Sequence, residues 1–409
     1  FLLCQCSSQP EHLTLTVNGE TVEVYEQNDA ALSLGLDTYK YASVDYDGSP
    51  KEILIETGFE FSNEDWDISP HSYEIKGVKE GRKLRFTVNR KGYIVVRFSK
   101  DQDFRKRLVI FLEEEIETPV NDVVNIIRDY GVDNSGNKNE TAKIQKALNE
   151  ISGSGKTLVF PTGIYKTSSL TFLSNSNIHL TKNAILKADP EDIDSYLAKE
   201  KGINRFIHIV DAENIQVTGL GTINGSGSEI LGSVLPRSGN TKTTVRLIFM
   251  LRSKNITFNG TVLKDAASWN THIMGCEDVV FRNCKLMNNT MNNDYFGSLD
   301  GWDPDASKRV LIEDCFGWAG DDNVAVKVTG SGNLGIYNDV EDITVRGCVF
   351  LTKKTSLKIG TETRSEHYKR ILFEDNDIIE ADRVMGVNVR DRATVDGVTF
   401  RDNRSEYVY

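Results

Sequence analysis

Three aspartates carry the chemistry that this sequence could perform. Asp321 and Asp322 are adjacent, and Asp300 precedes Asp321 by 321 − 300 = 21 residues. This spacing is about one coil of a parallel β-helix, whose coils stack about 4.8 Å apart. We therefore expect the three carboxylates to converge on one outer face. Crowded carboxyl groups cannot all ionise freely, so their pKa values separate, as a glycosidase needs for one acid and one base.

The same stretch permits another interpretation. Asp300, Asp303 and Asp305 could instead form a Ca²⁺ site or a solvated acidic loop. The six cysteines show no paired spacing of the kind that binds a metal. Our leading prediction therefore includes neither a metal nor a cofactor.

A recurring six-residue phrase predicts the scaffold. Its second and fourth residues are apolar, as in a strand with one face in a core. The copies begin at Asn177, Asn214, Asn255, Asp278, Arg309, Asp342, Arg370 and Gly397. The last three spacings, 342 − 309 = 33, 370 − 342 = 28 and 397 − 370 = 27, fit one coil per copy with loops of variable length. The pattern predicts an all-β fold with a right-handed parallel β-helix.

A column of small side chains follows the phrases. Five copies are followed directly by Cys284, Cys315, Cys348, Asn376 and Asn403. We interpret the column as an internal ladder, because three stacked cysteines would leave one without a disulfide partner.

Alternation along DDNVAVKV predicts how the aspartate pair is presented. The inward-facing residues would be Val324, Val326 and Val328. Strict alternation would then bury Asp322, so Asp321 and Asp322 share the outer face only if Gly320 makes the strand entry irregular.

The next two coils supply candidate substrate-binding residues. By the same alternation Lys358 and Glu362 face outward in one coil, and Asn388 and Arg390 in the following coil. An exposed ion pair between Glu362 and Arg390 is the structural alternative, and it would contribute only about 0 to 1 kcal/mol.

Aromatic residues and one histidine complete the candidate site. His272 lies one strand before the aspartates and could bind sugar or assist the acid, although it could also be structural. Trp302 could stack on a pyranose ring, as could Trp269 and Trp318, but each could equally fill a loop core.

The first part of the chain has a different pattern. Short alternating runs flank the turn Asn18-Gly19, a strong hairpin signal, and similar runs follow it. We predict a small antiparallel β-sandwich over residues 11–118, with a structural or spacer role, and a catalytic β-helix over residues 119–409. Asn139 should cap a helix before the first coil, and Gly153 should end it.

Both ends of the chain raise expectations about the natural protein. Residues 1–10, FLLCQCSSQP, resemble the end of a bacterial lipoprotein signal with Cys6 as the lipidated residue, although a cloning or gene-fragment artefact explains them nearly as well. This predicts an extracytoplasmic protein that is periplasmic, anchored to the outer membrane or secreted. The last phrase stops shortly before Tyr409, so we expect a longer natural chain.

Charge narrows the range of partners. The net charge of −12 argues against nucleic acid and provides no general attraction for a polyanion. An acidic polysaccharide would therefore have to be bound by locally placed Lys and Arg. We expect a monomer whose partner is its polysaccharide substrate.

From about Val124 to the end, the chain resembles glycoside hydrolase family 28, the polygalacturonase and rhamnogalacturonase family, in a Bacteroidetes-type form with an N-terminal sandwich. The family's Asn-Thr-Asp-Gly motif corresponds to residues 298–301, and its Gly-Asp-Asp motif to residues 320–322. The resemblance implies a pectin-lyase-like solenoid and pectin-degrading hydrolysis with inversion. Asp321 would be the general acid, and Asp300 and Asp322 would activate water.

Two departures from the family bear on the substrate. Lys354-Thr355-Ser356 stands where the family has Gly-His-Gly, and Asn388-Val389-Arg390 where it has Arg-Ile-Lys. Lost basic residues weaken the expectation of ordinary polygalacturonate. Two alternatives stay open: a lyase or epimerase with Lys327 or Lys358 as base, and a non-catalytic glycan-binding β-helix.

Overall fold

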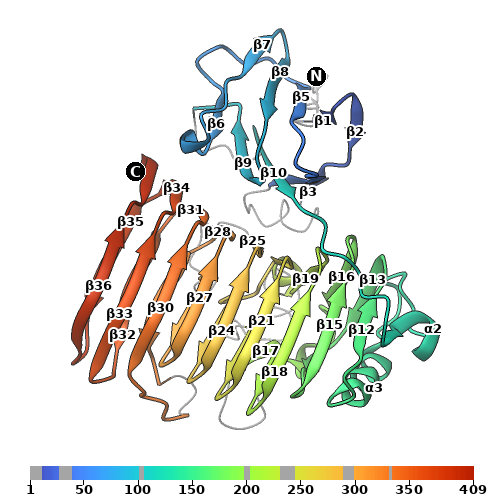
Figure 1. Cartoon of the computed structure of the whole chain (residues 1–409), viewed down its shortest axis with the longest axis vertical. Coiled ribbons are helices and arrows are strands. Elements are labelled where there is room, and N and C mark those ends of the chain that lie inside the picture. Colours follow the sequence, from blue (N-terminus) through green and yellow to red (C-terminus); the bar gives the residue numbers. More distant parts are fainter. Residues whose placement is uncertain are drawn as a thin grey trace, which may run out of the picture. The chain divides into compact units, whose positions relative to one another are not determined.

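The computed structural model describes residues 12–26, 39–100, 106–197, 203–230, 245–288, 299–330 and 334–409. It divides into two compact units, Phe1–Glu115 and Ile116–Tyr409 (Figure 1). The N-terminal segment on which the lipid-anchor prediction depends lies outside the described residues. None of the helices in the described ranges is long and apolar enough to span a bilayer.

The first unit consists of two five-stranded sheets. The first contains β2 (Glu20–Val22), β1 (Leu13–Val17), β5 (Lys51–Thr57), β8 (Lys83–Val88) and β7 (Val78–Glu80). The second contains β3 (Tyr25–Glu26), β4 (Lys40–Asp45), β10 (Arg107–Glu113), β9 (Gly92–Arg97) and β6 (Asp67–Ser69), with a 3₁₀ turn at His71–Tyr73. Buried residues of both sheets, such as Ile53 and Ile110, form one apolar core, which confirms the sandwich.

One strand pairing departs from the prediction of a purely antiparallel sandwich. β10 pairs antiparallel with β9 but parallel with β4, so the second sheet is mixed. The predicted hairpin is correct, because β1 and β2 pair antiparallel across Asn18 and Gly19. Both turn residues have positive φ, as a two-residue hairpin turn requires.

The second unit is a parallel β-helix of three sheets, as predicted (Figure 1). The first sheet contains β11 (Val123–Asn125), β12 (Thr157–Phe160), β15 (Ser176–Leu180), β18 (Glu213–Thr218), β21 (Lys254–Asn259), β24 (Glu277–Arg282), β27 (Lys308–Glu313), β30 (Val340–Arg346), β33 (His367–Glu374) and β36 (Thr394–Arg401). The second contains β13 (Gly163–Thr167), β16 (Ala184–Ala188), β19 (Thr222–Asn224), β22 (Val262–Lys264), β25 (Lys285–Met287), β28 (Phe316–Ala319), β31 (Val349–Thr352), β34 (Asp377–Ala381) and β37 (Arg404–Val408). The third contains β14 (Leu170–Thr171), β17 (Arg205–Val210), β20 (Arg246–Leu251), β23 (Thr271–Met274), β26 (Trp302–Asp305), β29 (Val324–Val328), β32 (Thr355–Thr363) and β35 (Arg383–Val389).

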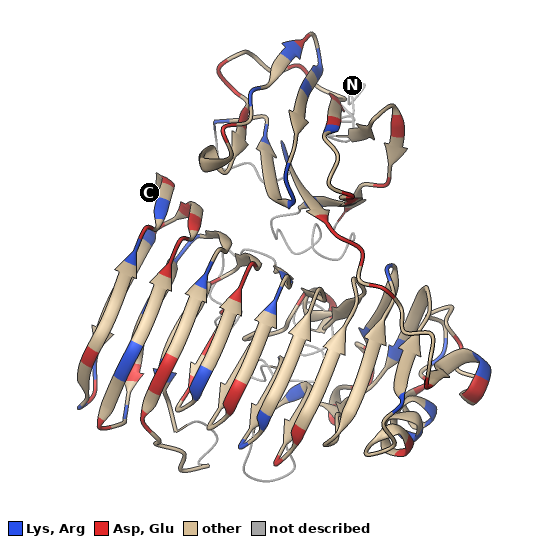
Figure 2. Ribbon diagram, in the orientation of Figure 1, with Lys and Arg blue, Asp and Glu red and all other residues tan. Residues whose placement is uncertain are grey.

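The repeated phrase coincides with strands of the first sheet, from β15 to β36. Charged residues lie near the ends of these strands (Figure 2). Arg309 pairs with Glu277 and Asp278 of the preceding coil, through contacts of 2.6 Å each. Such exposed pairs contribute little individually, so coil stacking depends chiefly on the core.

Short helices accompany the coils. They are α2 (Ile126–Tyr130), α3 (Thr141–Ile151), a 3₁₀ turn at Ile193–Ser195 and α4 (Gly227–Glu229). The predicted helix is α3, and its buried Ile144, Leu148 and Ile151 join the core of the β-helix. Its N-cap is Glu140 rather than Asn139, because Asn139 lies one residue too early and its Oδ1 accepts the N–H of Thr141.

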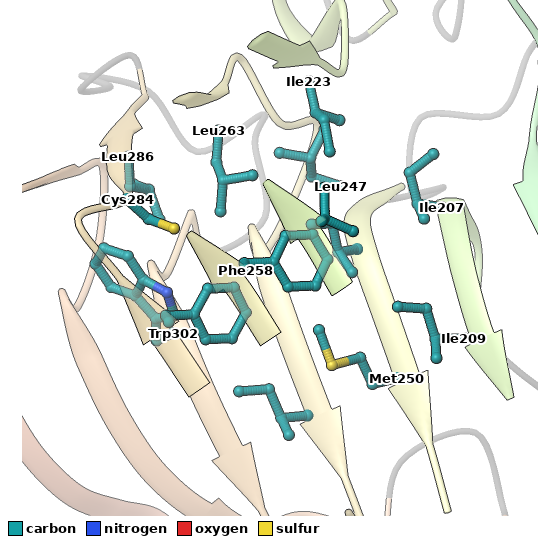
Figure 3. Close-up of a cluster of buried hydrophobic side chains, with 14 of the residues drawn as sticks. Ile207, Ile209, Ile223, Leu247, Met250, Phe258, Leu263, Cys284, Leu286 and Trp302 are labelled. Carbon is teal, nitrogen blue, oxygen red and sulfur yellow. The ribbon is translucent and has the colours of Figure 1, made fainter. Parts of the chain in front are cut away.

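The predicted column of cysteine and asparagine side chains lies inside the β-helix. Cys284, Cys315 and Cys348 are fully buried free thiols. The column continues through Asn376, whose Oδ1 accepts the N–H of Cys348 at 3.0 Å and whose Nδ2 donates to Asn403 at 2.8 Å. Cys284 belongs to the core cluster (Figure 3). The interpretation as a ladder without disulfides is therefore confirmed for the cysteines of the β-helix.

Candidate active site

The three aspartates come together at a corner between sheets. Asp321 and Asp322 occupy the turn from β28 to β29, and Asp300 lies two residues before β26, the strand beside β29. The N–H of Gly301 donates to the carbonyl of Asp322 at 2.8 Å, which aligns the two coils. One carboxylate oxygen of each aspartate lies within 4.8 Å of the others.

This turn replaces the irregular strand entry expected at Gly320. β29 begins only at Val324, so strand alternation does not apply to Asp321 and Asp322. Thr352 donates a side-chain hydrogen bond to the carbonyl of Asp321, and the N–H of Thr355 donates to Oδ1 of Asp322 at 3.1 Å. The turn is therefore held by the following coil.

Lys327 forms ion pairs with Asp300 and with the neighbouring Asp303. Its Nζ contacts Oδ2 of Asp300 and lies 2.9 Å from Oδ1 of Asp303, and all three residues are buried. Burial opposes the lysine charge, but the two carboxylates outweigh it and raise the pKa of Lys327. The ammonium therefore stays protonated, which keeps Asp300 oriented and makes Lys327 unsuitable as a base.

Lys358 contacts a carboxylate of the cluster directly. Its Nζ lies 2.7 Å from Oδ2 of Asp322. Burial and the nearby Asp300 raise the pKa of Asp322, while the hydrogen bond from Lys358 lowers it. The sequence-based prediction assigned Lys358 to substrate, whereas in the structure its ammonium is engaged by Asp322.

Asp321 has the properties of an acid. Burial raises its pKa to about 7, and Asp300 and Asp322 add to the effect, while Lys327 and Lys358 oppose it. The sequence predicted repulsion between carboxylates as the cause, but burial is the larger one. Asp321 is only partly buried, unlike Asp300 and Asp322, which are 1% and 4% exposed. Of the three carboxyl groups, that of Asp321 is therefore best placed to reach a bound sugar.

The separation of the carboxylates is shorter than inverting hydrolysis usually shows. The nearest oxygens lie within 4.8 Å, whereas inverting enzymes place their carboxyl groups about 6.5 to 9.5 Å apart and retaining enzymes about 5 to 5.5 Å apart. Separation alone therefore does not support inversion. The burial of Asp300 and Asp322 does support it, because a carboxylate that attacks the sugar directly must reach the anomeric carbon.

His272 does not reach the substrate surface. It is fully buried, with Phe249 on one side and Trp269 packed edge-on at 4.9 Å between ring centroids. Its Nε2 lies 2.9 Å from Oδ2 of Asp305, and burial lowers its pKa to about 4. The predicted direct contact with sugar is therefore wrong, and the neutral imidazole is structural.

Trp302 is also a core residue rather than a stacking platform. It is fully buried in the core cluster (Figure 3), and its ring packs edge-on against Phe281 and Phe350. The reason is register, because Trp302 pairs with the inward-facing Val324 of the next coil. Trp318 is buried as well, at 2% exposure.

Trp269 is the aromatic residue beside the carboxylates that retains some exposure. Nζ of Lys327 lies 3.9 Å from its ring centroid, and Cζ of Arg246 lies 4.3 Å away. Cations over an indole are stabilised by its ring electrons. The ring of Trp269 therefore stabilises the ammonium group of Lys327.

The three remaining predicted residues lie farther along the strands. Asn388 is half-buried in register with Gly360, Glu362 is half-buried, and Arg390 is exposed just after β35. No ion pair joins Glu362 to Arg390 in the described part of the chain. In register, Lys358 faces Gly386, so Arg390 lies four residues beyond that row, about 13 Å along a strand.

The Ca²⁺ alternative does not match the contacts. Asp303 faces Lys327, and Asp305 accepts from the N–H of Thr329 at 3.0 Å and pairs with His272. The carboxylates of Asp300, Asp321 and Asp322 are close enough for a cation, but lysines contact two of them. The donor set therefore suits proton transfer better than metal binding.

Sequence reasoning did not identify three contacts that support the site. Asp303 was considered only as a Ca²⁺ ligand, and Thr355 only as part of a departure from the family motif, whereas they contact Lys327 and Asp322. Arg246, which lies over the ring of Trp269, was not considered at all. The partners of Thr355 and Arg246 depend on loop packing that no spacing reveals.

The sequence is similar to known glycoside hydrolases. A family model described as glycosyl hydrolases family 28 matches residues 152–403. A "Probable polygalacturonase" of Vitis vinifera is 28% identical over 226 residues, covering 51% of this chain and 45% of that protein. An "Endo-polygalacturonase" of Pectobacterium carotovorum subsp. carotovorum is 26% identical over 254 residues, covering 51% and 62%. The chain thus covers less than two thirds of the length of each relative.

Solved structures agree on the fold. The "Family 28 Exopolygalacturonase" of Yersinia enterocolitica aligns with a TM-score of 0.61 at 17% identity, covering 88% of this chain and 78% of that one. "Dex49A" from Penicillium minioluteum aligns with a TM-score of 0.53 at 12% identity, covering 97% and 90%. Because the family model matches residues 152–403, more than half of the chain, the chain belongs to glycosyl hydrolase family 28.

Proposed function

We propose that the protein hydrolyses a glycosidic bond of an acidic, pectin-like polysaccharide, with inversion of the anomeric centre. One observation carries the proposal. Asp321 is a partly exposed carboxyl group with a pKa of about 7, and it lies beside two buried carboxylates. A proton donor next to ionised groups is the arrangement that acid-assisted attack by water needs.

Asp321 acts as the general acid. Its proton moves to the glycosidic oxygen while the bond from that oxygen to the anomeric carbon breaks. With a pKa of about 7, the carboxyl group is protonated over the acidic pH range and still transfers its proton readily. The leaving sugar departs as a neutral alcohol.

Asp300 and Asp322 hold the attacking water. Two oxygens within 4.8 Å can both accept hydrogen bonds of about 2.8 Å from one water molecule. Oδ1 of Asp300 is buried and has no hydrogen-bond partner among the described residues, so it can accept the water proton. The water oxygen then bonds to the anomeric carbon.

Burial argues against a covalent intermediate. A carboxylate nucleophile must bond to the anomeric carbon itself, yet Asp300 and Asp322 are 1% and 4% exposed and each contacts a lysine. A water molecule can bridge that gap, which favours direct displacement despite the short separation of the carboxylates.

The acidic substrate is supported by similarity and by local charge. The relatives at 25 to 28% identity include polygalacturonases and xylogalacturonan hydrolases by name. The exposed side chains of Lys354 and Arg383 lie in the two coils that follow the aspartate pair, although the chain as a whole has a net charge of −12. Because such polymers occur outside cells, we also infer an extracytoplasmic place of action.

A panel assay tests this function. Polygalacturonate, xylogalacturonan, rhamnogalacturonan and a neutral galactan are incubated with the protein, and new reducing ends are measured. We expect reducing ends on an acidic member, with a loss of about 10²-fold or more in Asp321→Asn. Absorbance from an unsaturated product would indicate a lyase, and binding without cleavage by the unaltered protein would contradict the proposal.

A further inference from the structure

The lysines at the carboxylates are not available to an acidic substrate. Lys327 contacts Asp300 and Asp303, and Lys358 contacts Asp322. If the substrate is acidic, as the proposed function holds, its carboxylate next to the scissile bond must meet other cations. Such cations must lie near the catalytic turn and form no ion pair within the protein.

Arg383 is one contact away from the cluster. It begins β35 in register with Thr355, and its Nη1 donates to Oγ1 of Thr355 at 3.4 Å. The N–H of the same threonine donates to Oδ1 of Asp322 at 3.1 Å. A single residue therefore links the guanidinium to the catalytic turn.

Gly386 lies next to the side chain of Arg383 and leaves room for it. It lies in register with Lys358, whose ammonium contacts Asp322, so a side chain at position 386 would lie in the row of Lys358. A Cβ at Gly386 would lie 3.3 Å from Cδ of Arg383 and 3.3 Å from Cγ2 of Thr355. The side chain of Arg383 therefore lies beside the row that holds Lys358.

A second cation adjoins it. Lys354 lies in the turn before β32, and its carbonyl accepts the N–H of Arg383 at 3.0 Å. Both side chains are exposed, and neither forms an ion pair with an acidic residue in the described ranges. Their charges are thus uncompensated, next to the turn of Asp321 and Asp322.

We propose that Arg383, with Lys354 beside it, binds the carboxylate of the sugar adjacent to the scissile bond. A guanidinium donates two parallel hydrogen bonds to a carboxylate, which fixes the orientation of the sugar as well as binding it. The inference rests on the proposed function and identifies its substrate as a uronic-acid polymer. It also replaces Arg390, which lies 390 − 383 = 7 residues beyond Arg383, about 23 Å along an extended strand.

Binding to a protein that cannot turn over substrate tests this site. In the Asp321→Asn background, calorimetry measures Kd for trigalacturonate and for its fully methyl-esterified form, which has the same sugars without charge. We expect tighter binding of the acid. Arg383→Gln should raise its Kd by about 10-fold or more and change the Kd of the ester by less than about 2-fold. Arg392→Gln, which removes an exposed arginine just beyond the strand, should leave both values unchanged.

A second variant keeps the charge but blocks its path. Gly386→Leu adds a side chain where Cδ of Arg383 now lies, so it should reproduce the selective loss of acid binding. Circular dichroism of each variant checks that the β-helix is intact. If Gly386→Leu does not fold, the Arg383→Gln comparison alone decides.

Several results would overturn the inference. They are equal binding of acid and ester by the parent, equal weakening of both by Arg383→Gln, and a larger selective effect from Arg390→Gln. The test is separate from the proposed function, because it measures binding without turnover. Selective loss in Arg383→Gln together with an inactive wild type would sustain this site and reject hydrolysis.

Discussion

The ammonium of Lys358 lies 2.7 Å from Oδ2 of Asp322, one coil away. This contact changes the role of a residue that the sequence assigned to substrate. Lys358 lowers the pKa of Asp322 against the effect of burial, so it helps to keep that carboxylate ionised. In the proposed mechanism, Lys358 thus keeps one of the two water-binding carboxylates ionised.

Replacing Lys358 by Met should therefore lower kcat more than it raises KM. Without the lysine, the pKa of Asp322 rises further, and a smaller fraction of the carboxylate is ionised at a given pH. The acidic limb of the kcat profile should move to higher pH. Lys369→Met, which removes a surface lysine near Asp339, is the matched control. A raised KM with unchanged kcat would instead support direct substrate binding.

Replacing Lys327 by Met should destabilise the fold. The variant leaves Asp300 and Asp303 buried without their shared counter-charge, and breaking a buried pair in this way costs about 3 to 5 kcal/mol. Denaturant unfolding measures the loss. Adding Asp303→Asn removes one of the uncompensated charges, so the double variant should recover part of the stability. No recovery would show that Asp303 does not share the lysine.

Stability should depend on pH through Asp321. Its folded pKa of about 7 lies above the unfolded value near 3.8, so its stabilising protonation is complete below about pH 4 and is lost as pH rises through 7. Asp321→Asn lacks this loss. The melting temperature of the variant minus that of the wild type should therefore increase from pH 5 to pH 8, and a constant difference would contradict the raised pKa.

The internal ladder makes a separate prediction. Asn376 is fully buried, accepts the N–H of Cys348 and donates to the carbonyl of Val345 at 3.1 Å. Asn376→Ala strands both groups away from water and should cost about 1 to 3 kcal/mol or more per group. Asn403→Ala, in the half-buried last rung, should cost less because water can replace the amide. Equal costs would mean that burial does not set the penalty.

Much of the fold could be predicted because each copy of the repeated phrase marks one strand in each coil. Alternating apolar residues locate the strands of the first sheet, and the cysteines mark its interior. The spacing from Asp300 to Asp321 also predicts convergence, since stacked coils leave little freedom in register.

The contacts within the site could not be predicted in the same way. Trp302 and His272 look equally suited to sugar in the sequence, yet the register of Trp302 with Val324 and the cover of Trp269 over His272 bury both. Asp322 is presented by a turn between sheets, where alternation says nothing. Arg383 could be recognised as a candidate ligand of the substrate only from its contacts with Thr355 and Gly386 in the structure.

The stereochemistry of the first product tests the central claim most directly. If Asp321 protonates the leaving oxygen while a water held by Asp300 and Asp322 attacks, the bond to water forms on the face opposite the departing sugar. Proton NMR during early turnover of the cleaved acidic glycan should then show the inverted anomer first, with the other form appearing only by mutarotation. Initial appearance of the retained anomer would mean that a carboxylate attacks the sugar and that the proposed roles are wrong.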